Sequence, residues 1–341
     1  MTNQKIKPRK RRGGNYFNLI DNIGSLLEQA RKDVYYAVNK ILVQTYWEIG
    51  KKIVEFEQSG KERAEYGSGL LDRLSDDLIE RYGRGFSAYN LRKMRQFYSM
   101  FQKWETVSPK LAWSHYRLIL RIDEELARSF YIKEVEKENW SVRVLDRQIN
   151  SMLFERIALS KDKKGVLKLA QKGQIIEKAS DLIKDPYILE FLGLEESSKY
   201  TESQLEQKII DNLQKFLLEL GKGFMFVSRQ QRITLEDEHF YIDLVFYNRL
   251  LKCFVIIDLK IGKLTHQDLG QLQMYVHYYD REVKQDDENP AIGILLCADK
   301  KEAVVKYTLP KDNKQIFASK YKLYLPDKKV LQQEIKKLLR D

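Results

Sequence analysis

FYIDLVFYNRLLKCFVIIDLKIGKLTHQDLGQLQMY, residues 240–275, decides the fold of the second half of the chain. The stretch reads as two strands followed by a helix, and successive side chains of a strand point to opposite faces. Each strand is therefore expected to have one apolar face and one face that carries charge. The apolar faces are Phe240, Ile242, Leu244 and Phe246 in the first strand and Cys253, Val255, Ile257, Leu259 and Ile261 in the second. The other faces carry Asp243 in the first strand and Asp258 with Lys260 in the second.

The two strands are expected to form a hairpin through the turn at residues 248–251. A turn centred between Leu250 and Leu251 places Asp243 directly opposite Asp258, with Cβ atoms about 4.5–5.5 Å apart. Two carboxylates at this distance repel each other among apolar neighbours, so one must hold a proton or a positive charge must lie between them. Lys260 shares the face of Asp258, and a divalent cation is the other partner that suits two carboxylates.

These residues resemble the PD-(D/E)XK nuclease signature, in which an acidic residue precedes an acid-X-Lys tripeptide on the next strand. Asp243 is the first acid, and Asp258-Leu259-Lys260 is the tripeptide, with Asp in place of the commoner Glu. Ile242 stands where the Pro of the family name would be. Gln271 and Tyr275 resemble the Q-xxx-Y element of the RecB-like branch of this superfamily.

The resemblance implies a role for each of these residues. Asp243, Asp258 and the main-chain carbonyl of Leu259 would bind Mg²⁺ or Mn²⁺. Lys260 would orient the attacking water or stabilise charge on the phosphate, with Gln271 and Tyr275 assisting.

A helix over residues 202–220 is expected before the hairpin, because apolar residues recur along one face and Gly221 follows as a stop signal. Glu206 lies beside this apolar stripe. By resemblance to the superfamily it would assist the metal, and a solvated helix Glu is the alternative. Strands are expected at about residues 224–233, 239–248, 252–261 and 291–298. The order αβββαβ agrees with a restriction-endonuclease-like core with a mixed sheet.

The excess of basic residues suits a protein that binds a polyanion. The chain has 341 residues and a net charge of +11, which favours a polyanionic partner such as nucleic acid. Six basic residues lie within the first twelve, and Arg11 and Arg12 are expected to contact phosphates. A disordered solubilising tail is the alternative for this arm. With two cysteines, no apolar run of membrane-spanning length and no signal peptide, we expect a cytoplasmic protein without a membrane partner.

The N-terminal half is expected to be helical. Apolar residues recur at helical spacing over residues 15–58, including Leu19, Ile23, Leu27 and Val34. Residues 70–103 read as a helix ended by Gly83, a short turn, and a second helix capped by Ser87, which is the outline of a helix-turn-helix. The second helix would present its polar residues to a DNA groove. They are Asn90, Arg92, Lys93 and Arg95. An ordinary αα-hairpin with a basic, solvated face is the alternative.

Further motifs in this half, including Trp47-Glu48-Ile49-Gly50 and Trp113-Ser114-His115-Tyr116, resemble the N-terminal domain of bacterial YhcG-type proteins. That family joins such a domain to a C-terminal PD-(D/E)XK nuclease domain. The expected organisation is a basic arm (1–14), a helical N-terminal domain that binds DNA or a partner (15–160), a helical connector (161–200) and a nuclease domain (201–341). The expected function is a Mg²⁺- or Mn²⁺-dependent deoxyribonuclease of endonuclease type. A catalytically inert DNA-binding or scaffold protein and an RNA-directed nuclease are the alternatives, and homo-oligomerisation is left open.

Overall fold

The computed structural model describes residues 14–58, 69–159, 163–194 and 200–325, with the isolated positions 327, 331, 333 and 335. The expected basic arm, with Arg11 and Arg12, lies outside the described residues. The chain divides into two compact units, one formed by residues 1–123 and 135–142 and the other by residues 124–134 and 143–341.

Among the described helices, none has both the length and the apolar character that a membrane crossing requires.

The first unit is helical, as the sequence predicts. Its elements are α1 (Gly14–Gln58), α3 (Leu70–Tyr82), the 3₁₀ turn η2 (Arg84–Phe86), α4 (Ala88–Met100), η3 (Trp104–Thr106), α5 (Trp113–Ile119) and the end of α6 (Glu125–Glu138). The expected boundaries between α3 and α4 are confirmed, because α3 ends before Gly83 and the Ser87 side chain accepts a hydrogen bond from the Asn90 amide at the start of α4.

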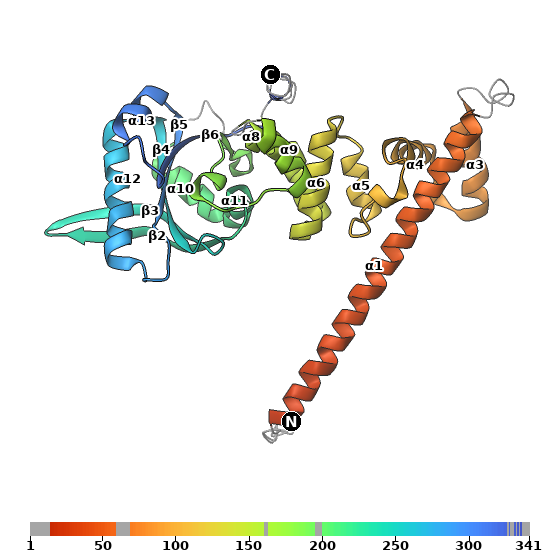
Figure 1. The fold of residues 1–341 in the computed structure, drawn as a ribbon, viewed down its shortest axis with the longest axis horizontal. Coiled ribbons are helices and arrows are strands. Elements are labelled where there is room, and N and C mark those ends of the chain that lie inside the picture. Colours follow the sequence, from red (N-terminus) through yellow and green to blue (C-terminus); the bar gives the residue numbers. More distant parts are fainter. Residues whose placement is uncertain are drawn as a thin grey trace, which may run out of the picture. The chain divides into compact units, whose positions relative to one another are not determined.

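Within the described part of the chain, the buried residues of helix α1 lie in its C-terminal part. Val43, Trp47 and Ile53 are buried there, and a Cβ atom at Gly50 would overlap the Met94 carbonyl, so the absence of a side chain lets α1 approach α4 closely. The apolar residues between Phe17 and Leu42 are exposed instead. Figure 1 shows α3 and α4 beside the C-terminal part of α1 only.

The second unit contains a six-stranded mixed sheet in the order β1-β6-β5-β4-β3-β2. The strands are β1 (Tyr187–Ile188), β2 (Phe224–Leu235), β3 (Glu238–Asn248), β4 (Cys253–Lys263), β5 (Ile292–Asp299) and β6 (Ile316–Lys322). The helices are most of α6, α7 (Val142–Asn150), α8 (Leu153–Ala158), α9 (Lys163–Lys172), α10 (Glu202–Asp211), α11 (Leu213–Leu220), α12 (His266–Tyr278) and α13 (Glu302–Thr308). Short turns are η4 (Ala179–Asp181), η5 (Glu190–Leu192) and the π-helical η6 (Tyr279–Val283). Strands β2, β3 and β4 are antiparallel, and β4, β5, β6 and β1 are parallel.

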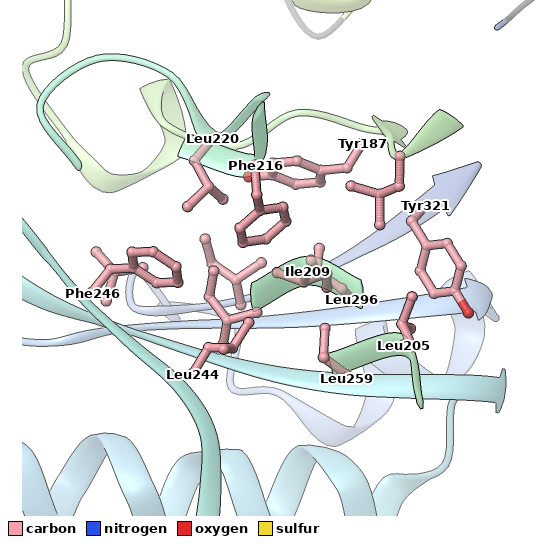
Figure 2. Close-up of a cluster of buried hydrophobic side chains, with 14 of the residues drawn as sticks. Tyr187, Leu205, Ile209, Phe216, Leu220, Leu244, Phe246, Leu259, Leu296 and Tyr321 are labelled. Carbon is pink, nitrogen blue, oxygen red and sulfur yellow. The ribbon is translucent and has the colours of Figure 1, made fainter. Parts of the chain in front are cut away.

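Each face of the sheet is covered by helices (Figure 1). On one face, α10 and α11 contribute Leu205, Ile209, Phe216 and Leu220 to a buried cluster with the strands; Figure 2 shows these side chains over Leu244, Phe246 and Leu259. On the other face, α12 contributes Leu269, Leu272, Tyr275 and Val276 to a second cluster. The expected restriction-endonuclease-like order is confirmed, with β1, β6 and α13 in addition.

The helix expected over residues 202–220 is instead two helices, so that prediction is wrong in one respect. Helix α10 ends at Asp211, and Asn212 has φ −117° and ψ 28° before α11 begins at Leu213. The Asn212 side chain donates to the Lys208 carbonyl, which offers the backbone an alternative to continuing the helix. The buried stripe is nevertheless retained at Leu205 and Phe216, because both helices lie on the same face of the sheet.

The apolar face expected for β3 is also corrected. Leu244 packs in the cluster beneath α10 and α11, whereas Ile242 packs in the cluster beneath α12, together with Val245. Strict alternation would place Ile242 and Leu244 on the same face. The break in alternation falls at Asp243, between the pairs Arg229↔Leu244 and Gln231↔Ile242, where Gln230 of β2 has φ 45°. Two-residue periodicity therefore holds on each side of Asp243 but not across it.

A buried anion links strand β1 to helices α8 and α11. Both carboxylate oxygens of Glu219, which is fully buried, accept hydrogen bonds from Arg156 on α8, at 2.6 and 3.3 Å. The same carboxylate accepts the Ile188 amide of β1 at 2.9 Å, and Arg156 also donates to the Pro186 carbonyl. Residues from α8, β1 and α11 therefore share one charged centre.

Candidate nuclease site

A hairpin positions the two acids that the sequence singles out. The paired residues of β3 and β4 run from Asn248↔Cys253 to Leu244↔Ile257, and the same register carries Asp243 to the position opposite Asp258. This confirms the predicted turn centre. The Asn248 side chain sets the turn, because its Oδ1 accepts the amides of Leu250 and Leu251, each at 3.1 Å.

Asp243 is held by two donors from neighbouring strands. Its Oδ2 accepts the backbone amide of Leu259 at 2.8 Å, and its Oδ1 accepts Nε2 of Gln230 at 3.1 Å. Burial nevertheless raises the pKa of Asp243 above its usual value, because desolvation outweighs the hydrogen bond from Leu259. The carboxylate is thus fixed in place while its charged form remains unfavourable.

Asp258 is the more buried of the two acids, with 2% of its surface exposed. Its Oδ2 is buried and has no hydrogen-bond partner, and its nearest cation is Nζ of Lys260 at 3.5 Å. Burial, followed by the charge of Asp243, raises the pKa of Asp258 to about 7. An oriented carboxylate oxygen without a donor in a buried site is a group that a cation would satisfy.

Lys260 supplies positive charge to the site. Besides Asp258, its Nζ lies 3.3 Å from Glu202 Oε2 on α10 and 4.0 Å from Asp268 Oδ1 on α12. Burial would lower the pKa of Lys260, but the charges of Asp258 and Glu202 outweigh it and the pKa is raised, so the ammonium form is held.

Glu206 is buried beside Asp243 and not solvated. Gln230 Nε2 donates to Glu206 Oε2 at 2.6 Å and also to Asp243, so one amide bridges the two acids. Burial raises the pKa of Glu206, and the charge of Asp243 raises it further, against the hydrogen bond from Gln230. The structure therefore brings Glu206 to the edge of the site.

Gln271 and Tyr275 form a pair at the same site on α12. Gln271 Nε2 donates to the Tyr275 hydroxyl, which in turn donates to the Tyr241 carbonyl at 3.1 Å, two residues before Asp243. Burial raises the pKa of Tyr275, and the charges of Asp258 and Asp243 raise it further. Tyr275 therefore ties α12 to β3 as a neutral phenol, with Gln271 beside it.

The residues expected to read DNA are spread around α4, which buries Leu91, Met94 and Phe97. Arg92 is exposed, and the other three are half-buried: Asn90, Lys93 and Arg95. Arg92 pairs with Asp72 at 3.0 Å and Arg95 with Glu57 at 2.7 Å. Lys93 donates to Gln96, and the Asn90 side chain donates to the Gly85 carbonyl. The Arg92–Asp72 pair is largely exposed, and such pairs contribute about 0–1 kcal/mol, so the arginine can exchange its partner for a phosphate.

The acids of the site suit a hard divalent cation that keeps part of its water shell. Among the described residues, no group of three or more His, Cys, Asp or Glu side chains is arranged as a metal-binding cluster. Two carboxylates plus substrate oxygens and water are an ordinary set of ligands for Mg²⁺. Asp258 Oδ2 accepts no hydrogen bond and lies 3.5 Å from the Lys260 ammonium, and burial raises the pKa of both aspartates, so a further cation would favour their charged forms.

Two contributors to the site were not expected from the sequence, namely Glu202 and Gln230. Glu202 lies in the first turn of α10, where an acidic residue is explained by the helix dipole alone. Gln230 has φ 45°, and its neighbours Arg229 and Gln231 pair with Leu244 and Ile242 on either side of Asp243. Only the register between β2 and β3 brings it there.

The mixed sheet flanked by α10 and α12, with Asp243 opposite the Asp258-Leu259-Lys260 strand, defines a nuclease-type domain of the PD-(D/E)XK class. Residues 180–337 match the family described as "YhcG PDDEXK nuclease domain", and residues 22–156 match the "DUF1016 N-terminal domain". The chain is 41% identical over 352 residues to the Escherichia coli (strain K12) protein named "Putative nuclease YhcG", with 94% of this chain and 93% of that protein covered. The chain therefore belongs to the YhcG family.

Two solved structures share part of the fold. A repair endonuclease from Pyrococcus abyssi is 19% identical, with a TM-score of 0.26 over 39% of this chain and 50% of that one. A structure titled "EndoMS-dsDNA2 complex" is 15% identical, with a TM-score of 0.27 over 40% of this chain and 51% of that one. The chain thus spans about half the length of each, and the family assignment stands without them.

Proposed function

We propose that this protein is a metal-dependent nuclease that hydrolyses phosphodiester bonds of DNA. The observation that carries the proposal is Asp258, which is buried opposite Asp243 with one oxygen free of hydrogen-bond donors and with Lys260 3.5 Å away. A purely structural acid at this depth would be expected to have all its oxygens satisfied. A cation held by Asp243 and Asp258 would lower the pKa of both carboxyls and offset their repulsion.

The residues of the site divide into metal ligands and groups that act on the phosphate. Asp243, Asp258 and the Leu259 carbonyl are the proposed ligands, with Glu206 at the edge of the set. A Mg²⁺ or Mn²⁺ ion held there would lower the pKa of a water molecule and neutralise charge on the phosphate. Lys260, held in its ammonium form, orients the attacking water or stabilises the charge that develops on the phosphoryl oxygens. Gln271, which donates to Tyr275, would hold a water or a substrate oxygen.

The N-terminal helical domain is proposed to bind nucleic acid or a partner. Asn90, Arg92, Lys93 and Arg95 on α4, together with Arg11 and Arg12 of the arm, are the proposed contacts. The net charge of +11 suits a polyanionic partner. We propose DNA as that polyanion and internal phosphodiesters as the bonds cut.

The proposal is tested by incubating a closed circular plasmid with the full chain and Mg²⁺, Mn²⁺ or EDTA. Nicked or linear products are expected with metal and none with EDTA. The Asp258→Asn variant should bind DNA but not cut it, whereas Asp287→Asn, which changes an exposed loop acid of the same domain, should cut normally. Cutting by the D258N variant, or cutting in EDTA, would exclude this mechanism.

The same assay separates the other functions. Binding without cutting under every metal condition would indicate an inert DNA-binding protein. Cutting of an RNA transcript but not of the plasmid would indicate an RNA-directed nuclease.

A further inference from the structure

The N-terminal part of α1 exposes a continuous apolar surface. Twelve large apolar side chains between Phe17 and Leu42 are each 42–71% exposed. They amount to on the order of 1,000 Å² of apolar surface, more than the few hundred Å² usual for the largest patch on a monomer. A standard protein–protein interface buries about 800 Å² per partner. The surface is therefore large enough to hold a stable interface by itself.

A seven-residue repeat runs through this apolar surface. Residues at alternating steps of three and four are all apolar, and we call them the seam: Ile20, Ile23, Leu27, Ala30, Val34, Ala37 and Ile41. A straight α-helix of 3.6 residues per turn drifts from such a repeat, and supercoiling around a second helix corrects the drift. The repeat therefore indicates that a second helix forms a coiled coil with this segment. A helix that packs on the core of its own chain does not need a strict seven-residue repeat.

The residue sizes along the seam favour an antiparallel partner of the same sequence. In a parallel, in-register pair Ala30 and Ala37 would each face their own copies, which leaves two underfilled layers. In an antiparallel pair centred between residues 28 and 29, Ala37 faces Ile20, Ala30 faces Leu27, and Val34 faces Ile23. Each alanine then lies opposite a larger side chain.

Charge points to the same arrangement. Residues 16–28 contain Asp21 and Glu28 and no cation, whereas residues 29–41 contain Arg31, Lys32 and Lys40 with one acid, Asp33. In an antiparallel pair centred between residues 28 and 29, the acidic half of each helix (net −2) lies opposite the basic half of the other (net +2). In a parallel pair the two acidic halves lie together, and so do the two basic halves. Antiparallel helices also oppose their macrodipoles.

We propose that residues 16–42 of α1 dock on the same segment of a second copy of this chain, forming an antiparallel two-helix coiled coil. The occupant is the chain itself, because both the size pattern and the charge pattern are self-complementary about one point. The dimer carries two copies of the nuclease-type site, but the proposal does not depend on catalysis.

The oligomeric state tests the proposal. Light scattering after size exclusion, over a concentration series, should give twice the chain mass. The double variant Leu27→Lys/Val34→Lys places four lysines in the seam of a dimer and should weaken dimerisation by about 100-fold or more. The matched control Ser25→Lys/Asn39→Lys adds the same charge to each half of the helix away from the seam and should remain dimeric.

Folding of the variants is checked separately. Leu27 and Val34 are 57% and 63% exposed in the single chain, whereas the buried residues of α1 start at Val43. Both variants should therefore keep the melting transition of the core. A wild-type chain that is monomeric throughout, or a seam variant that stays dimeric, would overturn the proposal.

Crosslinking tests the direction. Chains with Ile23→Cys and chains with Val34→Cys, distinguished by tags, are mixed and oxidised; the native Cys253 and Cys297 are buried and do not compete. Antiparallel docking predicts disulfides between the two kinds of chain. Disulfides within the I23C chains alone would show parallel docking and overturn the proposed arrangement.

Discussion

The Asp243 carboxylate accepts the backbone amide of Leu259 at 2.8 Å. The backbone pairing of β3 with β4 ends at Leu244↔Ile257, and beyond it this side chain of β3 accepts a hydrogen bond from β4 instead. The acid is thereby oriented by the main chain of the strand that carries Asp258 and Lys260. Asp243 therefore has a structural role, as acceptor for the Leu259 amide, in addition to its proposed role as a metal ligand.

Substitution of Asp243 should distinguish these roles. Asp243→Asn keeps an oxygen that can accept the Leu259 amide but loses the negative charge, whereas Asp243→Ala loses both. Both variants should cut plasmid at least about 100-fold more slowly, because a metal ligand is removed. The alanine variant should also be less stable than the asparagine variant by about 1–3 kcal/mol, because the Leu259 amide is left without a partner. Urea unfolding in EDTA measures this difference, and equal stabilities would contradict the structural role.

The raised pKa of Asp258 predicts a pH dependence of stability in the metal-free protein. In the folded state the pKa of Asp258 is about 7, so the carboxyl holds its proton up to that pH, whereas the unfolded state releases it near the ordinary aspartate pKa of 3.8. Between these values the folded state binds more protons, so its free energy of unfolding should fall as pH rises and stay low above pH 7. Asp258→Asn removes this penalty.

In EDTA, the D258N variant should therefore exceed the wild type by on the order of 2 kcal/mol at pH 8 and differ little at pH 4. Mg²⁺ at pH 8 should stabilise the wild type and not the variant. Asp287→Asn serves as the control, and stability curves for D258N and the wild type that run parallel from pH 4 to 8 would contradict the assigned burial of charge.

Gln230 should act as a positioning residue for the metal ligands. Gln230→Asn keeps an amide and suits the observed φ of 45°, but its side chain is too short to bridge Glu206 and Asp243. The Mg²⁺ concentration for half-maximal cutting should rise by about 10–100-fold, with little change in the melting temperature. Gln231→Asn, which changes the neighbouring, half-buried residue of β2, should behave as wild type. The same Mg²⁺ requirement in both variants would exclude this role.

The proposed DNA contacts of α4 should appear in the salt dependence of binding. Arg92→Ala/Lys93→Ala should weaken DNA binding and reduce the slope of log affinity against log salt by about 2, one for each lost phosphate contact. The control Lys164→Ala/Lys168→Ala removes two exposed cations of α9 and should leave the slope unchanged. Identical slopes in both pairs would show that α4 does not contact DNA through these residues.

The hairpin that brings Asp243 to Asp258 could be predicted from the sequence because its determinants are local. Apolar alternation and the turn that begins at Asn248 fix the register. Likewise, Gly83 marks the end of α3 and Ser87 the start of α4, because the capping residue lies next to the helix in the sequence.

The parts that escaped prediction depend on distant neighbours. Ile242 lies under α12, and the break in alternation beside it is opposite Gln230, whose φ is 45°; no feature of residues 240–246 shows this break. Glu202 reaches Lys260 only because α10 packs across β4. Strand β1 has two residues, too few to show a periodicity in the sequence. It is a strand only because it pairs with β6.

Strand β1 also determines where the gene can be divided for production of the catalytic part. A fragment that starts at residue 201 lacks β1 and Arg156, so the β6 edge is uncovered and Glu219 is left inside without its cation. An uncovered strand edge favours aggregation, and breaking a buried ion pair costs about 3–5 kcal/mol. We expect residues 201–341 to accumulate in the insoluble fraction and residues 124–341 to be recovered folded. Soluble expression of the shorter fragment with a cooperative melt would show that β1 is dispensable.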